Sequence, residues 1–245
     1  MRTTARLTVF LLFLALSGPI WAANFLKDGQ PDLLAQLPPP PSADSREQAE
    51  DMARVLALQA SRTPAQETFA NADAEMSVFR FADVLGPDFT ADRFPVAAAF
   101  FARIVSDGNE AYRPVKNHYA RPRPFLASPL VKPCVDPATI SRTGSYPSGH
   151  ATVGMTMGIV LSEIVPERRG EIMERATAYG NNRVLAGVHY PSDVAAGRTA
   201  GRIIAESMMA DPKFAVELDR ARAEIRSGLK WLGSGTPDGH AGDER

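Results

Sequence analysis

Three short clusters hold the side chains whose types and spacing could do chemistry. They span residues 116–124, 144–150 and 182–193 and read KNHYARPRP, GSYPSGH and NRVLAGVHYPSD. Their cations lie near prolines and turns, and two of their histidines, His150 and His189, lie beside a turn and a helix start. Such parts suit the binding of an oxyanion and the transfer of a group carried on it.

The second cluster, Pro147-Ser148-Gly149-His150, opens an apolar helix. The first turn of a helix presents free N–H groups and a partial positive charge, and both favour an oxyanion. Gly149 would let the backbone approach such an anion closely. The alternative is an ordinary N-cap, for which Ser148 is a common residue.

In the third cluster, His189 and Asp193 are four residues apart, and Pro191 suits the first turn of the next helix. An aspartate in that position can accept a hydrogen bond from the histidine ring. The bond would fix one tautomer, leave the other nitrogen free to attack, and stabilise a cationic ring afterwards. Alternatively, the histidine ends a loop, and Asp193 is favoured there by the helix dipole.

Lys116, Arg123 and Arg183 are suited to neutralising the oxygens of a phosphoryl group, because arginine offers a planar fork and lysine a compact charge. Isolated lysines and arginines are by default exposed surface charges. The functional interpretation is favoured because the three clusters supply complementary parts of one reaction.

The elements that must position these side chains are helices, since no window shows a convincing strand pattern. We expect helices at 44–60, 64–85, 94–105, 148–164, 167–185, 191–209 and 213–229, with an irregular, proline-rich stretch over residues 113–146. Loops of that length inside a domain are commonly functional. The sequence predicts an all-α, single-domain helical bundle.

Composition and the chain termini narrow the function class. The 245 residues are 44% hydrophobic with a net charge of −1, which is ordinary for a globular protein and unlike a nucleic-acid binder. Residues 1–22 read as a cleaved secretory signal, with an uncleaved anchor or core helix as the alternative. No membrane-spanning segment is expected afterwards.

The rest of the chain is predicted to divide into three parts: an extended Pro-rich arm at 23–43, the domain at 44–232 and a flexible tail at 233–245. Cys134 is the only cysteine, so no intrachain disulfide forms.

The three clusters together resemble the signature of the type-2 phosphatidic acid phosphatase superfamily, K-x6-R-P, then P-S-G-H, then S-R-x5-H-x3-D. Within it the chain is similar to the class A bacterial acid phosphatases, also in its tetraproline at 38–41 and in residues 119–125. The resemblance covers roughly residues 37–210. It implies a helical bundle of the phosphatase and haloperoxidase type, secreted to the periplasm, which hydrolyses small phosphate monoesters without a cofactor or metal. A homo-oligomer is a further expectation at the level of the family.

The resemblance also assigns roles to residues. It implies that His189 attacks phosphorus and becomes a phosphohistidine, that Asp193 orients and charge-balances it, and that His150 protonates the leaving alkoxide and then activates water. The phosphoryl oxygens would be held by Lys116, Arg123, Ser148, Gly149 and Arg183. No metal-ligand constellation is evident in the sequence.

The sequence departs from the family pattern at two positions and leaves several alternative roles and functions open. Asn182 stands where the family usually has serine, and we expect it to tune the phosphate pocket; Ala151 replaces a frequent threonine. His118 is interpreted as a loop histidine, while Tyr146 and Phe125 would either flank the substrate or pack in the core. The competing functions are a vanadium haloperoxidase, a membrane lipid phosphatase and a non-enzymatic phosphate- or partner-binding protein.

Overall fold

The structure is a computed structural model that describes residues 24–140 and 143–229. Its helical elements are α1 (Leu33–Gln36), α2 (Arg46–Ser61), α3 (Pro64–Ala72), η1 (Val78–Phe81), α4 (Ala82–Leu85), α5 (Pro95–Tyr119), α6 (Pro124–Ala127), η2 (Pro137–Thr139), α7 (Gly149–Ile164), η3 (Pro166–Arg168), α8 (Arg169–Leu185), α9 (Pro191–Met209) and α10 (Pro212–Gly228). Within these two ranges there is no strand, so the predicted all-α class is confirmed. The predicted signal segment and the tail at 233–245 lie outside the described residues.

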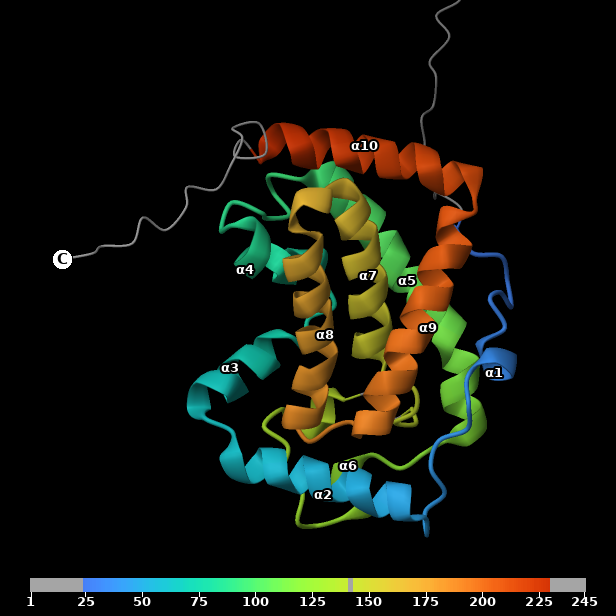
Figure 1. The fold of residues 1–245 in the computed structure, drawn as a ribbon, viewed down its shortest axis with the longest axis vertical. Coiled ribbons are helices and arrows are strands. Elements are labelled where there is room, and N and C mark those ends of the chain that lie inside the picture. Colours follow the sequence, from blue (N-terminus) through green and yellow to red (C-terminus); the bar gives the residue numbers. More distant parts are fainter. Residues whose placement is uncertain (1–23, 141–142, 230–245) are drawn as a thin grey trace, which may run out of the picture.

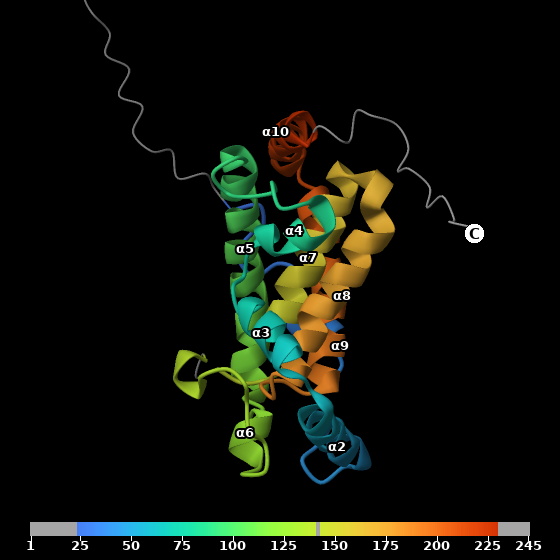
Figure 2. The ribbon, with the colours of Figure 1, turned by 90° about the vertical axis from the view of Figure 1, so that its left-hand side faces the viewer.

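The bundle is organised around α7, which is apolar on nearly all sides and is buried along most of its length. It packs against α5, α8 and α9, while α10 crosses one end and α2 crosses the other (Figures 1 and 2). The close approach of α7 to α9 depends on glycine. A Cβ atom at Gly201 would lie 2.5 Å from the Thr152 carbonyl oxygen, and a Cβ atom at Gly197 would lie 2.6 Å from the Ser148 carbonyl oxygen. Both distances are too short for any residue other than glycine.

The chain directions bring the sequence clusters together at one end of the bundle. Helices α7 and α9 begin at the end that α2 covers, and α8 ends there (Figure 1). The N-terminal arm runs along the bundle and joins the core. The Phe25 ring packs 4.9 Å from that of Phe214, and the Tyr146 hydroxyl donates to the Pro38 carbonyl.

Two predicted helix boundaries are wrong. Helix α5 does not end near residue 105; it continues through Pro114 to Tyr119 and ends at Ala120, whose φ is 43°. The proline is tolerated because its ring is exposed and the carbonyl that loses its donor belongs to Glu110, which is also exposed. The irregular stretch is therefore shorter than expected, and Lys116 lies on a helix.

The predicted helix at 64–85 is also interrupted. Helix α3 ends at Ala72, Asp73 forms its C-cap, and the chain passes through a turn before η1 begins at Val78. Among the described residues, no helix is long and apolar enough to cross a membrane.

Candidate active site

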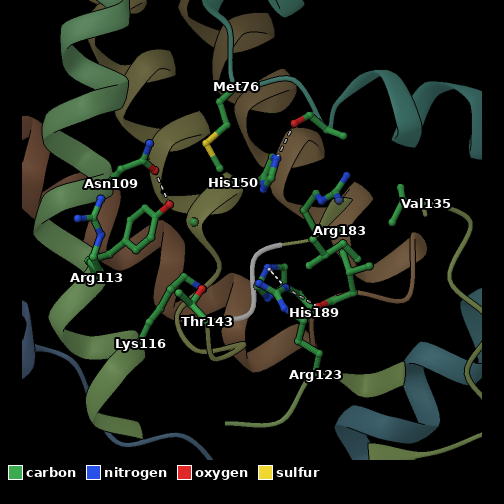
Figure 3. Close-up of a pocket in the computed structure, with 15 residues that line it drawn as sticks. Met76, Asn109, Arg113, Lys116, Arg123, Val135, Thr143, His150, Arg183 and His189 are labelled. Carbon is green, nitrogen blue, oxygen red and sulfur yellow. Dashed lines mark hydrogen bonds between the residues drawn. The ribbon is translucent and has the colours of Figure 1, made fainter. Parts of the chain in front are cut away.

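A cavity of about 340 Å³ opens at the end of the bundle where the three clusters meet (Figure 3). Six of the predicted site residues line it: Lys116, Arg123, Gly149, His150, Arg183 and His189. Met76, Val135 and Ile140 add an apolar part to the wall. The remaining two predicted residues, Ser148 and Asp193, are fully buried and do not line the cavity.

The hydrogen bonds around His189 define its tautomer. Arg123 Nη1 lies 3.0 Å from Nε2 of the ring. Because arginine can only donate, Nε2 must carry the lone pair and Nδ1 must carry the hydrogen. On the Nδ1 side, Asp193 Oδ2 lies at 3.4 Å and Ser145 Oγ at 3.3 Å. The unprotonated nitrogen thus faces the cations, as attack on a bound phosphoryl group requires.

Asp193 is held from several directions at the start of α9. Its carboxylate accepts hydrogen bonds from the Tyr190 backbone N–H at 2.8 Å and from Ser145 Oγ at 2.5 Å. Arg121 Nη1 donates to its other oxygen at 2.6 Å, forming a buried ion pair. These contacts fix the position of the carboxylate beside the His189 ring.

Arg121 itself is anchored by α2. Its Nη2 atom donates to Asp51 at 2.9 Å and to Gln48 at 2.6 Å, and its guanidinium lies 4.2 Å from the centre of the Tyr190 ring. A chain of charged contacts thus runs from α2 through Arg121 to Asp193. Sequence reasoning missed this link. The only signal was an arginine between the residues of a known motif, and its partners lie about 70 residues away in the chain.

Burial lowers the pKa of all three cavity cations. Burial, then the nearby Arg123, lowers the pKa of Lys116 to about 7, although Asp193 opposes this effect. Burial, partly opposed by Asp193, lowers the pKa of Arg123 to about 10, and burial also lowers the pKa of Arg183. Concentrated positive charge of this kind is relieved by an anion in the cavity.

The two arginines of the cavity are anchored by backbone carbonyls. Arg123 donates from Nη1 to the Val188 carbonyl at 3.0 Å, and Arg183 donates from Nη1 to the Ala70 carbonyl at 3.1 Å. Each guanidinium has further donors, and both side chains line the cavity, where they can bind an oxyanion.

His150 lies on the opposite side of the cavity. Its Nε2 atom lies 3.0 Å from the carbonyl oxygen of Ala74, in the turn after α3 (Figure 3). Since a carbonyl only accepts, Nε2 carries the hydrogen and Nδ1 carries the lone pair. Burial, followed by the charge of Arg183, lowers the pKa of His150 to about 3. The ring is therefore neutral at neutral pH.

Ser148 and Gly149 form the start of α7. Ser148 is the N-cap, and its Oγ accepts from the Ala151 N–H at 3.4 Å. Gly149 lines the cavity, and a Cβ there would lie 2.5 Å from the Tyr112 hydroxyl. The helix N-terminus is thus open to the cavity at Gly149, whereas a contact between the Ser148 hydroxyl and phosphate stays a prediction.

Four other residues discussed from the sequence lie away from the cavity. Asn182 donates from Nδ2 to Asp73 at 2.7 Å, so any effect on the phosphate pocket is indirect. Tyr146 is buried in the core and Phe125 packs partly buried, which favours the packing alternative for both. His118 is exposed, and its ring packs against Tyr119.

Comparison with known proteins identifies the family. Residues 95–216 match the model of the PAP2 superfamily. A non-specific acid phosphatase of Providencia stuartii is 33% identical over 209 residues, which cover 82% of this chain and 84% of the relative. The chain belongs to the PAP2 superfamily. A non-specific acid phosphatase of Salmonella typhimurium (strain LT2) is 32% identical over 196 residues, covering 77% of this chain and 78% of the relative.

These relatives confirm the resemblance to the class A acid phosphatases of the PAP2 superfamily. Among solved structures, a transmembrane PAP2-type phosphatidylglycerolphosphate phosphatase from Bacillus subtilis is similar over 73% of this chain and 89% of its own, with 17% identity and a TM-score of 0.47.

Proposed function

We propose that this phosphoric monoester hydrolase cleaves small phosphate monoesters through a phosphohistidine on His189. The observation that carries the proposal is the tautomer of His189: its lone-pair nitrogen faces the cavity cations, and its N–H faces Asp193. Monoester hydrolysis as the reaction is supported by the acid phosphatases that the chain resembles.

Three cations would bind the phosphoryl group. Lys116, Arg123 and Arg183 line the cavity together with Gly149 at the N-terminus of α7. Phosphoryl transfer depends chiefly on positioning and on stabilising the equatorial oxygens. These cations supply the positive charge that a metal supplies in other phosphatases, so we propose metal-independent catalysis.

His150 would act on the leaving oxygen. Its pKa is lowered to about 3, first by burial and then by the charges of Arg183, Lys116 and Arg123. A phosphoryl dianion cancels much of that positive charge and raises the pKa of the ring. His150 can then carry the proton that it gives to the leaving alkoxide, and the neutral ring left behind can activate water to release phosphate from His189.

The pKa of Lys116 favours activity on the acid side of neutrality. The side chain is a cation below about pH 7 and loses its charge above it. Phosphate binding should therefore be strongest in acid. We also propose that residues 1–22 export the protein to the periplasm and are removed there, which N-terminal sequencing of the periplasmic protein tests directly.

The direct test of function is phosphate release from p-nitrophenyl phosphate by the purified protein, with and without EDTA, between pH 4 and 8. We expect turnover that EDTA does not change and that falls above pH 7. Absence of turnover across this range contradicts the phosphatase function. Loss of activity in EDTA that is restored by a divalent cation contradicts metal independence.

A further inference from the structure

The C-terminal end of α3 supplies three backbone carbonyls to side chains at and beside the cavity. Ala70 O accepts from Arg183 Nη1 at 3.1 Å, and Ala74 O accepts from His150 Nε2 at 3.0 Å. Glu75 O accepts from the hydroxyl of Tyr179, whose ring lies 6.2 Å from that of His150. One turn of the chain therefore contacts the acid–base histidine and one of the phosphate-binding arginines.

That turn is held in place by the carboxylate of Asp73, which is fully buried. Arg175 donates to both of its oxygens, at 2.6 and 3.0 Å, and Asn182 Nδ2 donates at 2.7 Å. Arg80 Nε adds a fourth contact at 3.1 Å. A carboxylate with this many charge-assisted and amide donors has few alternative positions.

Helix α8 and the α3 end therefore fix each other. Arg175 and Asn182 of α8 hold Asp73, and the carbonyls beside Asp73 hold Arg183 of α8 and His150 of α7. Asn182 directly precedes Arg183 in the sequence, so a shift of the amide contact moves the backbone that carries the arginine. Displacements of about 1 Å at such supports can cost on the order of 100-fold in rate.

We propose that Asp73, Asn182 and Arg175 are positioning residues for His150 and Arg183, and that they act by fixing the turn whose Ala74 carbonyl selects the Nε2–H tautomer of His150. This role rests on the proposed function, because it assigns the consequence to protonation of the leaving group. The neutral carbonyl suits that step, since it orients the ring without adding a charge that would hold the proton.

The charged groups that face His150 come from several elements: Arg183 from α8, Lys116 from α5 and Arg123 from the segment before α6. A substitution at Asn182 removes none of these charges, although it can shift Arg183. A shift of Arg183 weakens phosphate binding for every substrate, so the part of the loss that depends on the leaving group reports the turn and its carbonyl.

The experiment compares Asn182→Ala with Asn181→Ala. Asn181 is the adjacent residue of α8, but its side chain accepts from Arg198 at the surface, so it is a matched control. Each variant is assayed on p-nitrophenyl phosphate, which has a good leaving group, and on β-glycerol phosphate, which needs its leaving oxygen protonated.

In single-turnover measurements of the phosphorylation step, we expect Asn182→Ala to lower the rate for β-glycerol phosphate by about tenfold and the rate for p-nitrophenyl phosphate by about threefold or less, because in that step only the former depends strongly on His150. Asn181→Ala should resemble the parent on both substrates. Asn182→Ser, which restores a donor, should recover part of the loss. An equal fall on both substrates is the mark of a merely structural role and overturns the proposal.

A measurement on the unaltered protein covers the case in which the alanine variant does not fold. ¹⁵N NMR of the histidine rings, assigned with a His150→Gln variant, should show the Nε2–H tautomer for His150. The Nδ1–H tautomer overturns the proposal. Failure of the proposed function is distinguishable, because His150→Ala would then show no leaving-group dependence, whereas failure of this inference leaves that dependence intact.

Discussion

The two histidines of the cavity are supported in different ways. His189 faces a carboxylate, Asp193, which continues through Arg121 to Asp51 of α2. His150 faces the uncharged carbonyl of Ala74 at the end of α3. Burial and the cavity cations lower the pKa of both rings, so both are neutral at neutral pH.

The difference matches what each ring has to do under the proposed mechanism. A nucleophilic histidine becomes a cationic phosphohistidine, so a permanent negative charge next to it stabilises the intermediate. An acid–base histidine must gain and lose a proton in each turnover, and a fixed carboxylate would hold that proton too strongly. Substitutions on the His189 side, where Asp193 carries a charge, should therefore change kcat differently from substitutions on the His150 side, where the Ala74 carbonyl is uncharged.

The largest effect should come from removing the charge on the His189 side. Asp193→Asn keeps the size of the side chain but removes the negative charge, and the amide can present its N–H₂ to the ring. We expect kcat for p-nitrophenyl phosphate to fall on the order of 10³- to 10⁴-fold, as for orienting aspartates in other histidine-dependent enzymes. Asp211→Asn, at the N-cap of α10, is a matched control outside the site. A fall in kcat below tenfold would mean that His189 does not depend on the charge of Asp193, and the contrast with His150 would be contradicted.

The next effect should appear on the His150 side and depend on the substrate. His150→Ala should lower the rate of the phosphorylation step on the order of 10²- to 10³-fold for β-glycerol phosphate, because proton transfer to a poor leaving group contributes that much. The loss for p-nitrophenyl phosphate should be about tenfold or less in the phosphorylation step. Equal losses for both substrates would show that His150 does not protonate the leaving oxygen.

A smaller effect should follow from the titration of Lys116, which separates anion binding from the two histidines. Its pKa of about 7 means that the cation is present below this pH and lost above it. Sulfate keeps a constant charge over this range, so its affinity as an inhibitor should fall by about tenfold between pH 6 and 8. A change of this size corresponds to the loss of one charge-assisted contact. Lys116→Arg keeps its charge and should flatten this dependence; an unchanged slope would contradict the assignment.

The smallest effect should come from the far end of the His189 support. In Asp51→Asn, Arg121 loses an ion pair but retains its contact with Asp193. We expect kcat to fall by about threefold to tenfold with little change in KM, since Asp193 keeps its charge and only its position loosens. A loss as large as that of Asp193→Asn would mean that α2 does more than anchor the arginine.

Much of the fold and most of the cavity could be predicted from the sequence. The predicted bounds of α9 are those found, and the N-cap of α7 at Ser148 is where the motif indicated. These features are local: a proline at the first helical position and a capping hydroxyl act within a few residues. The motif spacing also predicted one site for Lys116, Arg123, Arg183 and both histidines, and all five line the same cavity.

The supports behind the cavity could not be predicted, because they depend on contacts between distant segments. Asp73 interrupts a helix-like pattern, and its partners Arg175 and Asn182 lie 102 and 109 residues further along. No periodicity links them. Asn182 shows the same limit, since its motif position suggested that it tunes the phosphate pocket, whereas packing of α3 on α8 turns its amide towards Asp73.

The central claim is that His189 carries the phosphoryl group, and trapping of the phosphoenzyme tests it most directly. Wild-type protein is mixed with ³²P-labelled substrate, quenched in alkali within milliseconds and digested, and the labelled peptide is sequenced. The account predicts an alkali-stable, acid-labile phosphate on His189 that is absent from His189→Ala. A phosphate on another residue, or a phosphoenzyme that still forms in His189→Ala, would contradict it.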